Sequence, residues 1–237
     1  MATFVPKSTL MRLLQDIKEI MKNPLESQGI YYKHNESDML KGTAMIIGPK
    51  DTPYENGFYF FQIDFPTDYP NSPPKVKYLT NDGHTRFNPN FYRNGKVCLS
   101  ILNTWQGEKW SSCQSIRSIL VTLQMTLNEN PLLNEPGIHE DIHKNQIIEY
   151  NEIVTYKNIE LAILRYLENS ENCPLTFSIF HDIMIEKYFE NREKIMEIIN
   201  KNKNSACENS KRFVNIYNMP AICNYDALDK KINNLKL

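Results

Sequence analysis

One cysteine, Cys98, lies in a setting that suits a nucleophile. It falls within residues 87–102, FNPNFYRNGKVCLSIL, shortly after the turn signal Asn94-Gly95 and at the edge of a short apolar run. A thiol in this position is expected to be only partly exposed and held at a fixed angle. Because a free cysteine is more often a small buried hydrophobe, the neighbouring residues must decide between the two interpretations.

An amide donor stands eight residues before this cysteine. Asn90 closes the triplet Asn88-Pro89-Asn90, whose residue types favour turns over helix interiors. A neutral amide there can stabilise the oxyanion that forms when a carbonyl attached to Cys98 is attacked. The same side chain can instead bond the local backbone of the turn, and the two roles are compatible.

A second motif points to different chemistry. Residues 139–143 read HEDIH, the H-E-x-x-H pattern in which two histidines one helical turn apart bind zinc and the glutamate activates water. Pro136-Gly137 lies immediately upstream, which places the motif at a helix start. A third ligand would have to be a carboxylate or one of His34, His84 and His181. We therefore expect no metal here, and keep a zinc hydrolase as an alternative.

The elements that position these residues follow from hydrophobic periodicity. An amphipathic helix is predicted over residues 8–22, capped by Ser8 or Thr9. A second helix is predicted over 112–128, with Ser111 and Gln114 as its capping box. Between them, Gly, Pro, Asn and Asp in short linkers indicate an antiparallel meander, with strands over residues 29–33, 43–47, 58–65 and 76–79.

The rest of the chain is predicted to be mainly helical. From His139 on the pattern is helical, with breaks near residues 169–174 and 201–210 and a final helical stretch before the C-terminus. We expect an α+β fold with a core domain over residues 7–155 and a helical C-terminal extension over 156–237 that packs on it.

Composition excludes several classes of function. The chain has 237 residues, 41% of them hydrophobic, with 27 basic and 28 acidic side chains, so charge gives no case for nucleic acid. No apolar run approaches the length that spans a bilayer, so no membrane is expected, and the charged N-terminus is not a secretory signal. Five widely spaced cysteines favour reduced thiols and a cytoplasmic or nuclear location, or the host cytoplasm for a viral protein.

Three blocks in order carry a resemblance. They are GPKDTPYENG at residues 48–57, FPTDYPNSPPKV at 65–76, and Asn-Pro-Asn followed by Cys-Leu-x-Ile-Leu and Trp-Ser. Together they resemble the ubiquitin-conjugating (E2) enzyme family. The active-site stretch, with ENPLLNEPG at residues 129–137, is most similar to the E2 Z branch. The strong match covers residues 7–140, and a weaker one continues towards the C-terminus.

The resemblance implies a fold and a mechanism. The fold is the E2 (UBC) fold, a four-stranded antiparallel sheet with an N-terminal helix, a central helix and C-terminal helices. Cys98 would take ubiquitin, or a ubiquitin-like modifier, from an activating enzyme (E1) as a thioester. It would then pass the modifier to a substrate lysine or to a ligase (E3). Asn90 matches the family's catalytic asparagine, and no cofactor is needed.

Two further residues align with an acidic gate beside the family's cysteine. These are Asn134 and Glu135, where a carboxylate could orient the incoming lysine and help to deprotonate it. The alternative is an ordinary surface glutamate near a helix start. Cys113 lies near the start of the second helix, where packing is the expected role.

Three departures from the family pattern narrow the resemblance. Asn88 replaces a histidine found in most of the superfamily, a change that the E2 Z branch shares. Asn71 and Ser112 stand where RING-type ligases usually grip an aromatic residue and a proline. Either the usual contact with such a ligase is weak, or the ligase itself is unusual. A non-catalytic ubiquitin-binding variant of the same fold is a further alternative, which the retained Cys98 disfavours.

Overall fold

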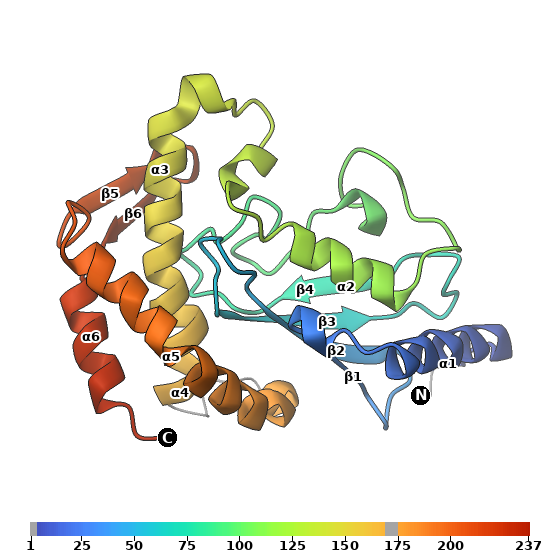
Figure 1. Cartoon of the computed structure of the whole chain (residues 1–237). Coiled ribbons are helices and arrows are strands. Elements are labelled where there is room, and N and C mark those ends of the chain that lie inside the picture. Colours follow the sequence, from blue (N-terminus) through green and yellow to red (C-terminus); the bar gives the residue numbers. More distant parts are fainter. Residues whose placement is uncertain (1–3, 169–174) are drawn as a thin grey trace.

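The computed structural model describes residues 4–168 and 175–237. Its centre is a four-stranded antiparallel sheet with strands in sequence order (Figure 1). The strands are β1 (Ile30–His34), β2 (Lys41–Ile47), β3 (Phe58–Asp64) and β4 (Lys75–Tyr78). The α+β meander is thereby confirmed, and each predicted strand is present with bounds that differ by one or two residues.

Strand β3 is buried on both of its faces. Its first four residues, FYFF at 58–61, are all at most 1% exposed. Successive side chains of a strand point to opposite faces, so such a run requires a covering layer on each side of the sheet. The register pairs Ala44 with Phe61 and Met45 with Phe60, which places these two pairs on opposite faces.

Two helices cover one side of the fold. Helix α1 spans Lys7–Lys22 and α2 spans Ile116–Met125, and their contact is tied by Arg12, which donates to the carbonyl oxygens of Ser112 and Gln114. The apolar residues that recur at helical spacing in this segment are all buried: Ile116, Ile119, Leu120 and Leu123 in α2, and Leu127 just after it.

Both predicted helix caps are wrong. The residue preceding α1 is Pro6, and the Thr9 hydroxyl instead donates to the carbonyl of Thr67 at 2.7 Å. The capping box of α2 is formed by Ser115 and Ser118, so the helix begins four residues later than predicted. Ser111 and Gln114 have the right types and spacing, but they form a turn before the helix.

The C-terminal part forms a second layer. Helix α3 (Glu140–Lys157) continues as a π-helix (Asn158–Leu164) and α4 (Arg165–Glu168). A 3₁₀ helix (Leu175–Phe180) then leads into α5 (His181–Lys203). The chain ends with the hairpin β5 (Lys211–Val214) and β6 (Met219–Ile222), followed by α6 (Tyr225–Asn234). The hairpin was not predicted, whereas the final helix was.

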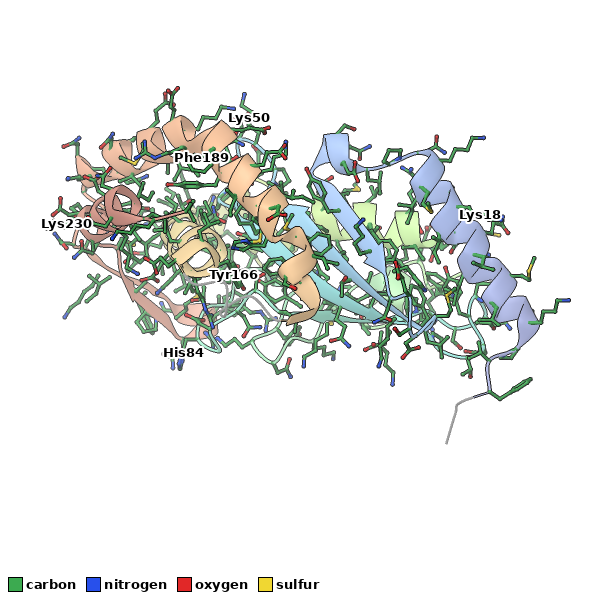
Figure 2. All side chains as sticks on the ribbon, turned by 90° about the horizontal axis from the view of Figure 1, so that it is seen from below. Lys18, Lys50, His84, Tyr166, Phe189 and Lys230 are labelled. Carbon is green, nitrogen blue, oxygen red and sulfur yellow. The ribbon has the colours of Figure 1, made fainter. Side chains whose placement is uncertain are left out.

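The π-helix, α4, α5 and α6 of this layer pack on the outer face of the sheet, whereas the β5–β6 hairpin packs in the cluster that holds α2. Phe60 lies 4.9 Å, ring to ring, from both Tyr166 and Phe177. Figure 2 shows the sheet from this side, with Tyr166 labelled on the helical layer. In Figure 1, α1 and α6 lie at opposite ends of the molecule. A C-terminal extension that packs on the core is therefore present. The predicted boundary after residue 155 falls inside α3, so the division into two domains stays a prediction.

Two predictions concern residues outside the described ranges: the helix break at residues 169–174 and the reduced state of Cys173.

In the described part of the chain, no helix is both long and apolar enough to cross a membrane.

Candidate active site

The thiol of Cys98 lies under a short loop. Cys98 is 4% exposed, and its Sγ donates to the carbonyl oxygen of Thr104 at 2.9 Å. The thiol is followed by the 3₁₀ turn Ser100–Leu102, and Asn103 then adopts a left-handed conformation that reverses the chain. The loop residues 103–109 are all exposed. The backbone of this exposed loop therefore holds the thiol on one side.

Thr104 bonds this loop to the segment that contains Cys98. Its hydroxyl accepts from the backbone N–H of Leu99 at 2.9 Å and lies 2.9 Å from the carbonyl oxygen of Val97. These bonds grip the backbone on both sides of the cysteine. Sequence patterns gave no indication of this role, because it depends on how the chain returns after Asn103.

Asn90 is bonded directly to the cysteine. Its Nδ2 donates to the carbonyl oxygen of Cys98 at 2.8 Å, and the N–H of Cys98 donates to the carbonyl oxygen of Asn90 at 2.8 Å. The two residues are thus held as a reciprocal pair, although seven residues separate them. This arrangement is the backbone-bonding role considered above. The amide is half-buried and bonds the carbonyl oxygen of Cys98, not its thiol, so the oxyanion role stays a prediction.

A buried asparagine supports the turn that carries Asn90. Asn88 is fully buried, accepts from the N–H of Asn90 at 2.8 Å, and donates to the hydroxyl of Tyr54 at 2.9 Å and to the carbonyl oxygen of Thr126 at 2.7 Å. Tyr54 in turn donates to the carbonyl of Phe87 at 2.6 Å. Burial raises the pKa of Tyr54, which keeps its hydroxyl protonated as a donor. The turn is therefore fixed from inside the core.

The same carbonyl links the turn to the predicted acidic gate. Asn134 donates to the oxygen of Thr126 at 3.3 Å, so Asn88 and Asn134 share one acceptor. Both Asn134 and Glu135 are half-buried, and Glu135 follows the short helix Pro131–Asn134. A Glu135 oxygen accepts from the hydroxyl of Tyr217 at 2.6 Å. Cys98, Asn90 and Asn134 thus belong to one hydrogen-bonded network through Asn88 and the Thr126 carbonyl. Glu135 is the next residue after Asn134, and it bonds Tyr217. The sequence did not reveal the roles of Thr104 and Tyr217.

Comparison with known proteins gives the family. The family model described as "Ubiquitin-conjugating enzyme" matches residues 12–159, which is more than half of the chain. This chain belongs to the ubiquitin-conjugating enzyme family. The family resemblance and its fold, expected from the sequence, are thereby confirmed.

Individual relatives of this E2 family member belong to the same family. Ubiquitin-conjugating enzyme E2 Z of Xenopus tropicalis is 46% identical over 166 residues, covering 70% of this chain and 52% of the relative. The E2 Z of Homo sapiens is also 46% identical over 166 residues, covering 70% and 46%. The chain therefore spans about half the length of the curated relatives it matches. The solved structure of human ubiquitin-conjugating enzyme E2 G1 has 33% identity and a TM-score of 0.45, covering 53% of this chain and 98% of that one.

The H-E-x-x-H motif of this E2 family member does not have the geometry of a regular helical pair. His139 precedes α3 in an extended conformation, and His143 interrupts the helix with φ −108° and ψ 18°. The Nδ1 of His143 lies 3.1 Å from the backbone nitrogen of His139, and the two rings are 6.5 Å apart. Across residues 4–168 and 175–237, no group of three or more metal-ligating side chains comes together.

The remaining sequence predictions concern the surface. Cys113 is exposed and lies before α2, so the expected packing role is wrong. Asn71 and Ser112 are both exposed, on the two loops where the family pattern places a ligase contact. Trp110 joins these loops, because its Nε1 donates to the carbonyl oxygen of Pro70 at 2.7 Å. A ligase that binds there would meet polar side chains on a braced surface.

Proposed function

We propose that this chain accepts ubiquitin, or a ubiquitin-like modifier, from an activating enzyme as a thioester on Cys98 and transfers it to a lysine or to a ligase. The E2 Z relatives favour this branch of the family. The observation that supports the proposal most is the reciprocal pairing of Cys98 with Asn90, which presents a thiol and an amide donor from one rigid turn.

The proposed chemistry has two acyl transfers. The Cys98 thiolate attacks the carbonyl of the thioester on the activating enzyme, and that enzyme's thiolate leaves. A neutral lysine amine, or a ligase cysteine, then attacks the new thioester. The Cys98 thiolate leaves, and for lysine an isopeptide bond forms and the amine loses a proton.

Neighbouring residues would act mainly on the second transfer. Asn90 would donate to the oxyanion of the tetrahedral intermediate once its amide turns from the Cys98 carbonyl. Glu135 would orient the lysine and accept its proton. The Thr104 carbonyl accepts a hydrogen bond from the thiol in the resting protein, so this bond has to break before Cys98 attacks the incoming thioester. The activating enzyme would supply the ATP-dependent step, and the expected location is the cytoplasm or nucleus, or the host cytoplasm for a viral protein.

A charging reaction with activating enzyme, ubiquitin and ATP tests the proposal on a non-reducing gel. The wild type should form an adduct that a thiol reductant removes. Cys98→Ser should give a reductant-resistant oxyester, because an alkoxide leaves less readily than a thiolate, and Cys98→Ala should give no adduct. A reductant-sensitive adduct on Cys98→Ala would move the site to another cysteine, with the exposed Cys113 as the first to examine.

A further inference from the structure

A tyrosine of the C-terminal extension reaches back to the candidate active site. Tyr217 lies in the turn between β5 and β6, and its hydroxyl donates to a carboxylate oxygen of Glu135 at 2.6 Å, across 82 residues of sequence. Burial and the adjacent carboxylate raise the pKa of Tyr217, so its hydroxyl stays protonated as a donor. A hydrogen bond to a charged acceptor restricts the rotamers of a half-buried glutamate.

The same tyrosine contacts the turn that carries Asn90. Its backbone carbonyl accepts from Nη2 of Arg93 at 2.8 Å, and its ring lies 5.3 Å from the guanidinium carbon of Arg86. Arg86 donates to the carbonyl oxygens of Asn88 at 3.1 Å and Pro89 at 2.7 Å. Arg86 therefore braces the Asn-Pro-Asn turn and is itself held against an aromatic ring of the extension.

The extension holds this tyrosine in place. Asn218 takes a left-handed conformation that lets β6 return along β5, and Val214 pairs with Met219. Both of those residues are buried, and the sulfur of Met219 accepts from the N–H of Arg86 at 3.2 Å. The base of the hairpin is tied to α3 by an ion pair between Arg212 and Glu152. The position of the Tyr217 hydroxyl is therefore set by the folded extension.

We propose that Tyr217 is a positioning residue for lysine transfer, which fixes Glu135 directly and the Asn90 turn through Arg86. The proposal rests on the function proposed above. It assigns the extension a part in the second acyl transfer, because Glu135 and Asn90 act there and not in thioester exchange. Loss of the hydroxyl leaves the carboxylate present but free to leave its productive orientation, and positioned proton transfer is sensitive to such displacement.

Tyr217→Phe is the decisive variant, because it removes the hydroxyl and keeps the ring over Arg86. Pulse-chase discharge to free lysine is compared with the charging rate. We expect the ratio of discharge to charging to fall about tenfold, part of the 100- to 10,000-fold that general acid–base catalysis contributes. The matched control is Tyr225→Phe in the same extension, since the buried Tyr225 hydroxyl has no hydrogen-bond partner among the described residues. Its ratio should match the wild type.

A double variant separates positioning from general loss of structure. If Tyr217 acts through Glu135, Tyr217→Phe should add little to the defect of Glu135→Ala, so the double variant discharges at nearly the rate of the single one. Multiplied defects, or a wild-type ratio in Tyr217→Phe, would overturn the role of Tyr217. A wild-type chain that never accepts the modifier would instead overturn the proposed function and this proposal with it.

Discussion

The two faces of the sheet are covered by different parts of the chain. On the inner face, Ala44 and Phe61 belong to a cluster with the buried stripe of α2. On the outer face, Met45 and Phe60 belong to a second cluster, built largely from residues after Lys157. The strands are shared, yet every predicted site residue belongs to the side that holds α2. The β5–β6 hairpin also packs on that side, because Val214, Met219 and Ala221 belong to the first cluster and Tyr217 packs against it.

This difference separates chemistry from support. The turn with Asn90 and the segment with Cys98 are bonded to each other, and the turn is bonded to the core around Tyr54. The outer layer supplies burial for one face of β3, and the β5–β6 hairpin supplies a contact to Glu135. We therefore expect damage to the outer layer to reduce stability, loss of the hairpin contact to slow lysine transfer, and damage to the site to abolish transfer while the fold remains.

The largest expected effect on stability comes from the shared strand. Phe60→Ala should lower the free energy of unfolding by about 3–5 kcal/mol, the usual cost of deleting a buried phenylalanine. Phe61→Ala is the matched variant on the opposite face and should cost a similar amount, since both side chains are fully buried. Denaturant unfolding, followed by far-UV circular dichroism and by tryptophan fluorescence, measures both variants.

The two probes decide whether the layers unfold together. Both tryptophans, Trp105 and Trp110, lie near Cys98 and α2, so fluorescence reports the inner side. Coincident transitions that shift equally in Phe60→Ala indicate one cooperative unit. A fluorescence transition that stays in place in that variant would mean that the outer layer unfolds alone.

The next effect concerns Asn90. Asn90→Ala should still accept the modifier but discharge it to free lysine about 100- to 1,000-fold more slowly, which corresponds to about 2.7–4 kcal/mol for the loss of one oxyanion donor. Thioester exchange is nearly balanced in energy and has a good leaving group, whereas aminolysis forms the oxyanion from a poorer nucleophile. Pulse-chase discharge gives the rates.

A melting curve of the same variant separates the two roles of Asn90. The Asn90 amide donates to the Cys98 carbonyl oxygen, so Asn90 has an evident structural role in supporting the turn. If this is its only role, Asn90→Ala would melt early, and charging and discharge would fall together. That outcome would remove the oxyanion role, while an unchanged melting temperature with slow discharge would establish it.

Local patterns predicted the inner side well for physical reasons. Alternation in the second half of β3, where Gln62 and Asp64 are half-buried, and the apolar stripe of α2 are consequences of burial on one face. The Asn90–Cys98 pair is close in sequence. The four residues FYFF also carried the information that a second layer exists, because each was too apolar for a solvated face.

The remaining contacts depend on the return of distant chain segments. Thr104 and Tyr217 are ordinary residues by type, and only the folded loop and hairpin bring them to Cys98 and Glu135. The capping error arose because Ser111 with Gln114 and Ser115 with Ser118 offer the same spacing. That error also made Cys113 a helix residue, although it lies exposed before α2.

A smaller effect is expected where the two layers meet in the π-helix. Asn158 is 2% exposed, donates to the carbonyl oxygen of Glu55 at 2.9 Å and accepts from the hydroxyl of Tyr59 at 2.6 Å. Asn158→Ala leaves these two groups without a partner, and the loss at the buried Tyr59 hydroxyl costs about 1–3 kcal/mol, whereas Glu55 is half-buried and its carbonyl loses less. Tyr59→Phe in the same background should restore part of the lost stability in denaturant unfolding. No recovery would show that the Tyr59 hydroxyl finds another partner.

The smallest effect is expected at the start of α3, which serves neither layer. His139 is exposed and precedes the helix, and the backbone at His143 departs from helical geometry, so the two rings are not held one regular turn apart. Zinc needs its ligands preorganised at about 2.0–2.1 Å from the metal, and the conformation offers no such pair. His139→Ala combined with His143→Ala should change the free energy of unfolding by no more than about 0.5 kcal/mol, as for most surface substitutions. Charging should also be unchanged, both in this variant and in the wild type after chelation with magnesium restored. Elemental analysis of purified protein is the decisive measurement: stoichiometric zinc that disappears in the double variant would make the start of α3 a metal site.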